Sequence, residues 1–328
     1  MAYTTIDDPE AYFQTVLYAG NSSTQSITLG GDTDLQPDLV WIKSRADAGE
    51  HTLYDSVRGA TKRLDSADDG DEDTVTNGVT AFDSDGFSLG AGGNENSAAT
   101  IVAWCWKETA DAGFDIVTYT GNGSNRTISH SLSAVPHMMI VKKTSADDGW
   151  AVYHKGNTSA PATDHLRLDT TAATVDDDNE WNDTVGTSSV FTIGTGGRVN
   201  DNTATYIAYL WSEKQGYSKF GSYKGNANAN GTFVHVGFRP AFVLLKNSTG
   251  ANGWEMRDNK RPGYNYNTGT LAPSSSDAET TGEGIDIFSN GFKLRASGNG
   301  QNGDNTYIYM AFAEAPFVNS NGVPCNAR

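Results

Sequence analysis

The sequence has few cysteines, few basic residues and no long apolar segment, and each shortage argues against a class of protein. Its 328 residues include two cysteines, Cys105 and Cys325, whose separation fits no metal-binding or redox motif, so we expect both to be unpaired. Lys and Arg number 23 against 40 Asp and Glu, and the net charge of -17 opposes binding to nucleic acid or to an anionic membrane. No apolar run approaches transmembrane length, so we expect no membrane insertion. Residues 1–8 lack a basic region and an apolar core, so we expect synthesis in a cytoplasm without a signal peptide.

The residues that are abundant indicate an all-β protein. Glycine occurs 36 times, and Asn, Asp, Ser and Thr crowd the same stretches, which is typical of strands joined by tight turns. Aromatic residues make up 10% of the chain, enough to build a core, so the chain is not disordered.

Five short markers recur three times in the same order, which predicts three tandem copies of one unit. They are a Tyr-x-Gly-Asn turn (18–21, 119–122, 223–226), a Pro-initiated apolar strand ending in Lys (37–43, 136–142, 240–246), a residue pair eleven positions later (54–55, 153–154, 257–258), a short alternating strand (86–90, 190–194, 291–294) and an aromatic-rich strand ending in Glu (101–108, 206–213, 307–314).

We therefore predict three tandem β-sandwich repeats at residues 13–108, 113–213 and 219–314. A lead-in at 1–12 precedes them, where Asp8 can cap a short helix that starts at Pro9 and continues towards Gln14. A tail at 315–328 follows, without a strand pattern. Two placements of this tail stay open, namely docking on a neighbouring subunit and folding back on the third repeat.

The closing strand of each repeat is apolar on both faces. Alternation in the first copy directs Ile101, Ala103 and Cys105 to one face and Val102, Trp104 and Trp106 to the other. Such a strand is buried on both sides, in the centre of a sandwich or where two repeats meet. We expect Trp106, Trp211 and Phe312 to be equivalent core residues. We also expect the end repeats to keep apolar surface that another chain covers, which suggests a homo-oligomer.

No pattern of catalytic residues is visible. None of the six histidines stands in a nucleophile motif, and His154 occupies a position that holds Asp55 and Asp258 in the other repeats. We therefore expect no catalytic residue and no enzymatic activity.

Two acidic runs, 65–73 and 176–183, raise the question of a cation site. Carboxylates such as Asp68, Asp71 and Asp73 suit Ca²⁺, although neither run has EF-hand spacing. The alternative is an exposed, solvated acidic loop, and we favour it over a weak Ca²⁺ site. We expect no other cofactor.

Three aromatic residues in polar segments are candidates for carbohydrate binding. Trp181 lies within the second acidic run, and Tyr264 and Tyr266 lie within Pro262–Asn267. An aromatic face stacks on a sugar ring while neighbouring amides bind its hydroxyls. The alternative, which we favour, is that these rings fold back onto the protein or pack on a neighbour.

Several of these segments resemble repeat-containing virion proteins of marine and cyanobacterial tailed phages. The resemblance is carried by residues 8–15, 37–43, 54–59 with 62–64, 85–87 and 102–107, and it extends over nearly the whole chain. It implies a structural protein of the virion with lectin-like β-sandwich units, in contact with other virion proteins, as a head decoration, tail-tip or tail-fibre component. The sequence has no stalk or heptad segment, which favours a knob or decoration over an elongated fibre.

As a surface component of the virion, the protein is also expected to aid attachment to a glycan on the host surface. Two alternative functions stay open: a free array of carbohydrate-binding modules, and a tail-associated enzyme that degrades polysaccharide.

Overall fold

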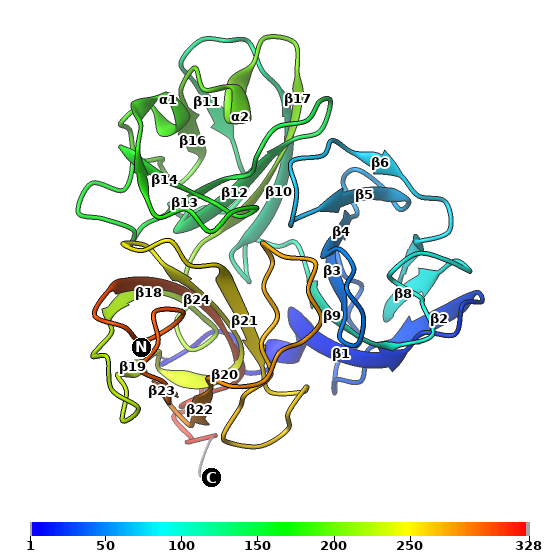
Figure 1. Ribbon diagram of the computed structural model, residues 1–328, viewed down its shortest axis with the longest axis vertical. Coiled ribbons are helices and arrows are strands. Elements are labelled where there is room, and N and C mark those ends of the chain that lie inside the picture. Colours follow the sequence, from blue (N-terminus) through cyan, green and yellow to red (C-terminus); the bar gives the residue numbers. More distant parts are fainter. Residues whose placement is uncertain (1, 326–328) are drawn as a thin grey trace.

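The computed structural model describes residues 2–325, in which nearly all regular structure is antiparallel β-strand (Figure 1). The helical elements are the 3-10 turn η1 (Pro9–Ala11) and two single-turn helices, α1 (Asp178–Trp181) and α2 (Gly197–Asn200). The predicted all-β sandwich fold is confirmed. Within the described residues, no helix is long and apolar enough to span a membrane.

Three large sheets, one in each predicted unit, have the same order over their first four strands. In each, the closing strand lies second, between the first strand of the unit and the Pro-initiated strand. The first sheet has the order β1 (Phe13–Ala19), β9 (Thr100–Trp106), β3 (Leu39–Ser44), β4 (Thr52–Asp55), β5 (Lys62–Asp65), β6 (Asp73–Thr74). The second has the order β10 (Phe114–Thr120), β17 (Thr205–Trp211), β12 (Met138–Lys143), β13 (Ala151–His154), β14 (Asp164–Arg167), β15 (Val175–Asp176). The third has the order β18 (Ser218–Lys224), β24 (Thr306–Pro316), β20 (Phe238–Asn247), β21 (Trp254–Asp258).

A small sheet packs on the outer face of each large sheet and completes a sandwich. The small sheets are β2 (Gln25–Thr28), β8 (Gly86–Leu89), β7 (Val79–Asp83); β11 (Arg126–Ser129), β16 (Val190–Ile193); and β19 (Phe233–His235), β23 (Gly291–Leu294), β22 (Ile285–Phe288). In the first sandwich, Phe87 and Leu89 of β8 share a buried cluster with Val40 of β3 and Ile101 of β9. Corresponding clusters fill the second and third sandwiches.

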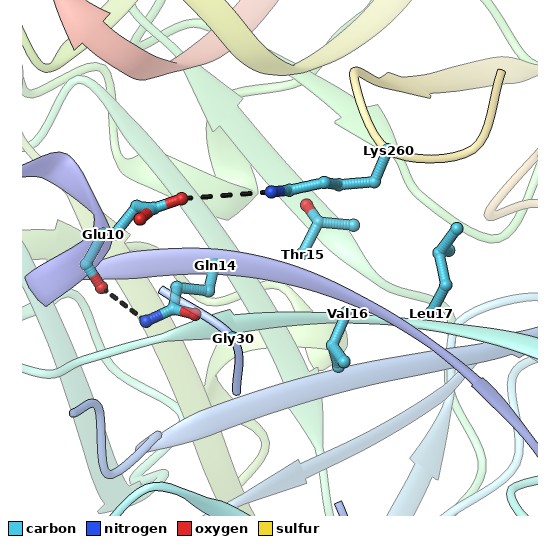
Figure 2. A pocket seen from close by; sticks show the side chains of 7 residues that line it. All are labelled: Glu10, Gln14, Thr15, Val16, Leu17, Gly30 and Lys260. Atoms are coloured by element: carbon cyan, nitrogen blue, oxygen red, sulfur yellow. Dashed lines mark hydrogen bonds and ion pairs between the residues drawn. The ribbon is translucent and has the colours of Figure 1, made fainter. Parts of the chain in front are cut away.

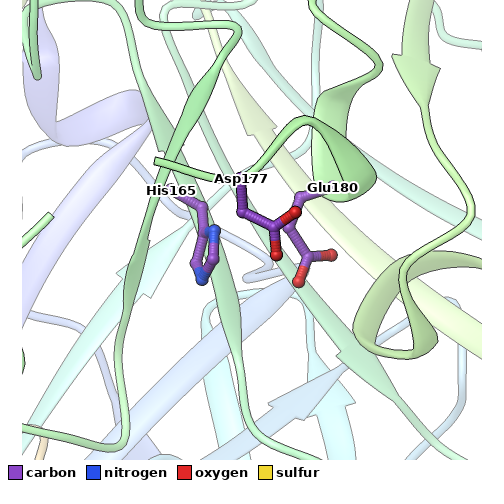
Figure 3. Close-up of side chains that lie close together, drawn as sticks. All are labelled: His165, Asp177 and Glu180. Carbon is purple, nitrogen blue, oxygen red and sulfur yellow. The ribbon is translucent and has the colours of Figure 1, made fainter. Parts of the chain in front are cut away.

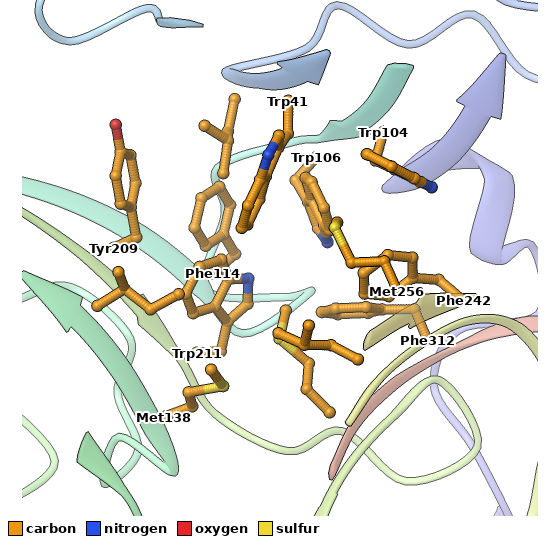
Figure 4. Close-up of a cluster of buried hydrophobic side chains, with 14 of the residues drawn as sticks. Trp41, Trp104, Trp106, Phe114, Met138, Tyr209, Trp211, Phe242, Met256 and Phe312 are labelled. Carbon is orange, nitrogen blue, oxygen red and sulfur yellow. The ribbon is translucent and has the colours of Figure 1, made fainter. Parts of the chain in front are cut away.

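The inner faces of all three large sheets meet in one further apolar cluster (Figures 1 and 4). Trp106 and Trp211 lie edge to face with ring centroids 6.5 Å apart, and Phe312 lies 5.8 Å from Trp106. These three side chains are at most 1% exposed. The prediction that they are core residues is confirmed, and the core that they share belongs to all three units.

The prediction that each closing strand is buried on both faces is also confirmed. Ile101, Ala103 and Cys105 point into the first sandwich, and Val102 and its alternate neighbours point into the central cluster. The prediction that the end units leave such faces for another chain to cover is wrong for the faces that meet in the central cluster. The third unit packs against the first as well as the second, so that all three inner faces are covered within the chain.

The Tyr-x-Gly-Asn marker attaches the first strand of each unit to the loop before its closing strand. The asparagine backbone N–H donates to a buried asparagine side chain in that loop, for example Asn21 to Asn96 Oδ1 at 3.0 Å. A Cβ atom on Gly20 would lie 1.7 Å from the carbonyl oxygen of Ser97, so only glycine fits. The other two units repeat the bond, from Asn122 to Asn200 and from Asn226 to Asn302.

Polar contacts between the units close a ring of three. The last residue of the third marker, buried in every unit, contacts the closing strand of another unit. The contacts are Tyr209 Oη to Asp55 Oδ2 (2.8 Å), His154 Nε2 to the carbonyl oxygen of Tyr309 (3.1 Å) and Trp104 Nε1 to Asp258 Oδ2 (3.1 Å). The first unit thus contacts the second, the second the third, and the third the first.

The lysine that ends each Pro-initiated strand makes a second ring of contacts. All three side chains are buried, and each donates to a backbone carbonyl of another unit: Lys43 to Ser276 (3.3 Å), Lys142 to Asp69 (2.9 Å) and Lys246 to Thr171 (3.1 Å). Buried ammonium groups are stable only when their hydrogen bonds are satisfied, so these lysines depend on the neighbouring unit.

The two ends of the chain differ from their predicted boundaries. Asp8 caps η1 through its contact with the Glu10 N–H (3.0 Å), as predicted, but the helical turn ends before β1, which contains Gln14. Strand β24 continues to Pro316, into the predicted tail, and pairs with β20. Farther on, the Ser320 N–H donates to Asp7 Oδ1 at 2.7 Å, so the described part of the tail folds back on its own chain. Residues 326–328 of the predicted tail lie outside the described residues.

Candidate functional site

A surface hollow of roughly 270 Å³ lies beside Tyr264, on the third unit. Arg239 of β20, Asn259 after β21 and Ile287 of β22 contribute to its wall, together with the loop that contains Tyr264. Tyr264 is 86% exposed, so its ring is free to contact a bound molecule. The structure therefore places one of the three predicted aromatic residues at a hollow.

The loop around Tyr264 is fixed by its asparagine side chains. Asn265 donates through Nδ2 to the carbonyl oxygen of Ile287 and accepts from the Ile287 N–H, both at 2.9 Å. Asn267 is buried and donates to the carbonyl oxygen of Asp258 at 2.6 Å. Because Asn265 and Asn267 anchor the segment that follows Tyr264, the position of the Tyr264 backbone is defined even though its ring is exposed.

Two amide oxygens at this hollow are without a hydrogen-bond partner among residues 2–325. They are Oδ1 of Asn259 and Oδ1 of Asn267, both buried. An unsatisfied buried acceptor is unfavourable, and a small opening of the wall would let a ligand hydroxyl donate to these oxygens and offset that cost. Arg239 adds a charged donor, which is paired with Glu314. An aromatic face, amide oxygens and a guanidinium are the groups that suit a polyhydroxylated ligand.

The other two predicted aromatic residues are placed differently. Tyr266 is 44% exposed, but it does not line the hollow, and its hydroxyl donates to the carbonyl oxygen of Gly282 at 3.1 Å. Trp181 is 1% exposed and packs in the second sandwich, with its ring 6.0 Å from that of Tyr153. For Trp181 the structure therefore agrees with the alternative that the ring folds back onto the protein, because the helical turn α1 directs it inwards.

The acidic loop 65–73 has exposed carboxylates at Asp68, Asp71 and Asp73, as predicted. They are not gathered into a group with metal-ligand spacing; Asp73 is paired instead with Arg63 at 2.8 Å. The backbone of this loop contacts the second unit, where the Asp148 N–H donates to the carbonyl oxygen of Asp69 at 2.8 Å. Its structural contribution is thus a contact between units.

A second polar group lies in the second unit, where His165, which the sequence analysis did not single out, joins two carboxylates of the acidic run 176–183 (Figure 3). His165, Asp177 and Glu180 each place one potential ligand atom within 4.8 Å of the others. His165 lies on β14, Asp177 caps α1 and Glu180 lies within α1. Burial lowers the pKa of His165 to about 4, so its imidazole is neutral at pH 7.

A further hollow of roughly 260 Å³ lies between the first and third units (Figure 2). It is bordered by Gln14, Val16 and Leu17 of β1 and by the Glu10–Lys260 pair, whose charged atoms are 3.9 Å apart. Leu17 is 39% exposed, and the ion pair is partly solvated, so this hollow offers few directed polar groups.

Three further histidines, the buried His51 and His154 and the partly buried His137, have structural partners. His51 accepts from Trp41 Nε1 at 3.2 Å, and His137 accepts from the Glu213 N–H at 2.7 Å. Burial lowers the pKa of His137 to about 4 and that of His154 to about 3. The position shared by His154 with Asp55 and Asp258 is thus a contact between units.

Comparison with known proteins gives a family and no established activity. No curated protein matches the chain. One family model, described as a domain of unknown function (DUF7483), matches residues 8–316. That range begins at the cap of η1, includes all three large sheets and ends at the last residue of β24. The chain therefore belongs to the DUF7483 family, and the match spans the whole three-unit body.

Proposed function

We propose that this protein is a structural component on the surface of a tailed-phage particle, and that it contacts saccharides of the host surface through the hollow at Tyr264. The observation that carries the proposal is the combination of an exposed ring with two unpartnered amide oxygens, on Asn259 and Asn267. This set matches the alternating apolar and hydroxylated faces of a sugar ring.

The architecture supports a role in display. Three sandwiches share one core and are joined by two rings of buried polar contacts, so the loops are carried on a rigid body. Shallow contact with a rigid aromatic residue suits weak binding that is strengthened by many copies on one particle. The resemblance of residues 8–15 and 102–107 to phage virion proteins supports the particle as the location.

Titration of host-surface polysaccharide into the purified protein tests the saccharide contact. We expect Tyr264→Ala to weaken binding by about tenfold, because the stacking surface is lost. Tyr264→Phe is the matched control, since it keeps the ring and should bind as the natural protein does. Equal binding by all three proteins would show that the hollow is not the contact site.

Mass spectrometry of purified particles tests the location. We expect the protein at a fixed copy number in particles that have been washed free of cell debris. Its absence there, together with retained saccharide binding, would favour a free array of carbohydrate-binding modules. Release of soluble sugar from host polysaccharide by the purified protein would favour the third function, a depolymerase, and would contradict a purely structural role.

A further inference from the structure

His165, Asp177 and Glu180 come together because strand β14 runs beside β15, which leads directly into α1. Residues Asp164 and His165 pair with Asp176 and Val175, and Asp177 follows as the cap of the helix. Figure 3 shows the Asp177 carboxylate between the imidazole of His165 and the carboxylate of Glu180. The potential ligand atoms of all three side chains lie within 4.8 Å of one another.

The group contains buried atoms that have no protein partner. His165 is 0% exposed, and neither of its ring nitrogens has a hydrogen-bond partner among residues 2–325. Glu180 is 1% exposed; its Oε1 accepts from Arg198 at 3.2 Å, and its Oε2 is unpartnered. Leaving such groups unsatisfied is unfavourable, so the arrangement favours a ligand that accepts electron pairs from a nitrogen and from carboxylate oxygens.

In the first unit, the position that matches His165 holds a positively charged side chain. The second residue of β5 is Arg63, as the second residue of β14 is His165. The Arg63 guanidinium lies 2.8 Å from an Asp73 oxygen and 3.5 Å from an Asp65 oxygen. In the second unit an imidazole replaces this guanidinium, and the guanidinium of Arg198 pairs with Glu180 at 3.2 Å.

We propose that His165, Asp177 and Glu180 bind a divalent first-row transition metal ion, and that Zn²⁺ fits best. Imidazole nitrogen suits Zn²⁺ and related ions, whereas Ca²⁺ prefers sites made only of oxygen. Two ligand atoms of a tetrahedral Zn²⁺ lie about 3.4 Å apart, so side chains whose ligand atoms lie within 4.8 Å of one another reach bonding geometry when they move closer by up to about 1.4 Å. Three protein ligands leave a fourth position for water.

The surroundings of the site favour occupancy by a metal ion. Asp177 is only half-buried and connects the site to solvent, which gives the ion a path of entry. The ion would tie β14 to α1, and so hold the single helical turn that carries the buried Trp181.

Isothermal titration of ZnCl₂ into the chelator-treated full chain tests the proposal. We expect one Zn²⁺ per chain and at least tenfold weaker binding by His165→Gln and by Asp177→Asn. His235→Gln, which changes an exposed histidine, is the matched control and should bind normally. Titration with CaCl₂ should give much weaker binding that does not depend on His165.

Asp177→Asn keeps the test informative if the buried His165 variant does not fold, because Asp177 is partly exposed. Binding of Co²⁺ gives a second readout, since a mixed nitrogen and oxygen ligand set produces visible absorption bands that should disappear in both variants. The proposal is overturned if no Zn²⁺ binds, or if Zn²⁺ binds equally well to folded His165→Gln and Asp177→Asn.

Discussion

At the scale of single residues, one buried position is occupied by Asp55, His154 and Asp258 in the three units. The two aspartates accept from a tyrosine hydroxyl and from a tryptophan N–H. His154 faces the carbonyl oxygen of Tyr309, which can only accept, so this position needs a donor. The residue type changes with the hydrogen-bonding character of the neighbouring unit, and this explains why no histidine recurs at the position.

His154 makes the stability of the protein depend on pH. Its Nδ1 accepts from the Gly156 N–H at 3.0 Å while Nε2 donates to Tyr309, so both contacts require the neutral ring. Burial lowers its pKa to about 3, below the value of about 6.5 in an unfolded chain. Between these values the unfolded state binds more protons, and stability therefore falls as the pH falls through this range.

We expect the natural protein to lose about 2 kcal/mol between pH 7.5 and pH 5 relative to His154→Asn, which cannot titrate. Urea unfolding of both proteins at the two pH values measures this difference. His235→Asn, which changes an exposed histidine, is the control for replacing a histidine by asparagine. The same gap between the natural protein and His154→Asn at both pH values would show that His154 does not titrate as described.

At the scale of elements, the closing strands β9, β17 and β24 organise the molecule. Each is buried on both faces, so its alternate side chains serve a sandwich core and the central cluster at once. The period of two in the sequence was sufficient to predict this, because apolar residues at every position of a strand leave no polar face.

Truncation of a closing strand should therefore be costly. We expect Trp211→Ala to lower the free energy of unfolding by about 3–5 kcal/mol, because it leaves a cavity between Phe114, Trp106 and Tyr209. Thermal unfolding measures the loss. Tyr264→Ala removes an exposed ring and is the control. An unchanged melting temperature for Trp211→Ala would place this residue outside the core.

Two features of the elements were beyond reach of the sequence pattern. Trp181 stands among acidic residues, which predicted an exposed loop, but one helical turn capped by Asp177 is enough to turn its ring inwards. His165 was not recognised as a candidate ligand because its neighbours Asp177 and Glu180 lie on the next elements along the chain. The available signal was an Asp and a Glu three residues apart, following a strand that pairs with one containing a histidine.

At the scale of the whole molecule, the three units form a closed body. The sequence markers predicted the strands and their order within each unit, but they predicted uncovered apolar faces at the ends of the array. The contacts that close the body join distant positions, such as Arg45 with Glu279 at 2.5 Å and Trp104 with Asp258. Alternation along one strand carries no information about such partners, so the closure could not be predicted from it.

The same limit applies to the candidate saccharide site. Tyr264 was predicted from its polar surroundings, whereas Arg239, Asn259 and Ile287 reach the hollow from three other positions along the chain. The partners of an exposed aromatic residue depend on how the strands are arranged, and this arrangement became visible only in the folded structure.

Differential scanning calorimetry of the full chain tests most directly the claim that three sandwiches share one core. Because the inner face of each large sheet lies in the same cluster, no unit can unfold without exposing the apolar surface of the other two. We predict a single transition whose calorimetric enthalpy equals its van't Hoff enthalpy. Two or three separate transitions, or a calorimetric enthalpy that is a multiple of the van't Hoff value, would contradict the account.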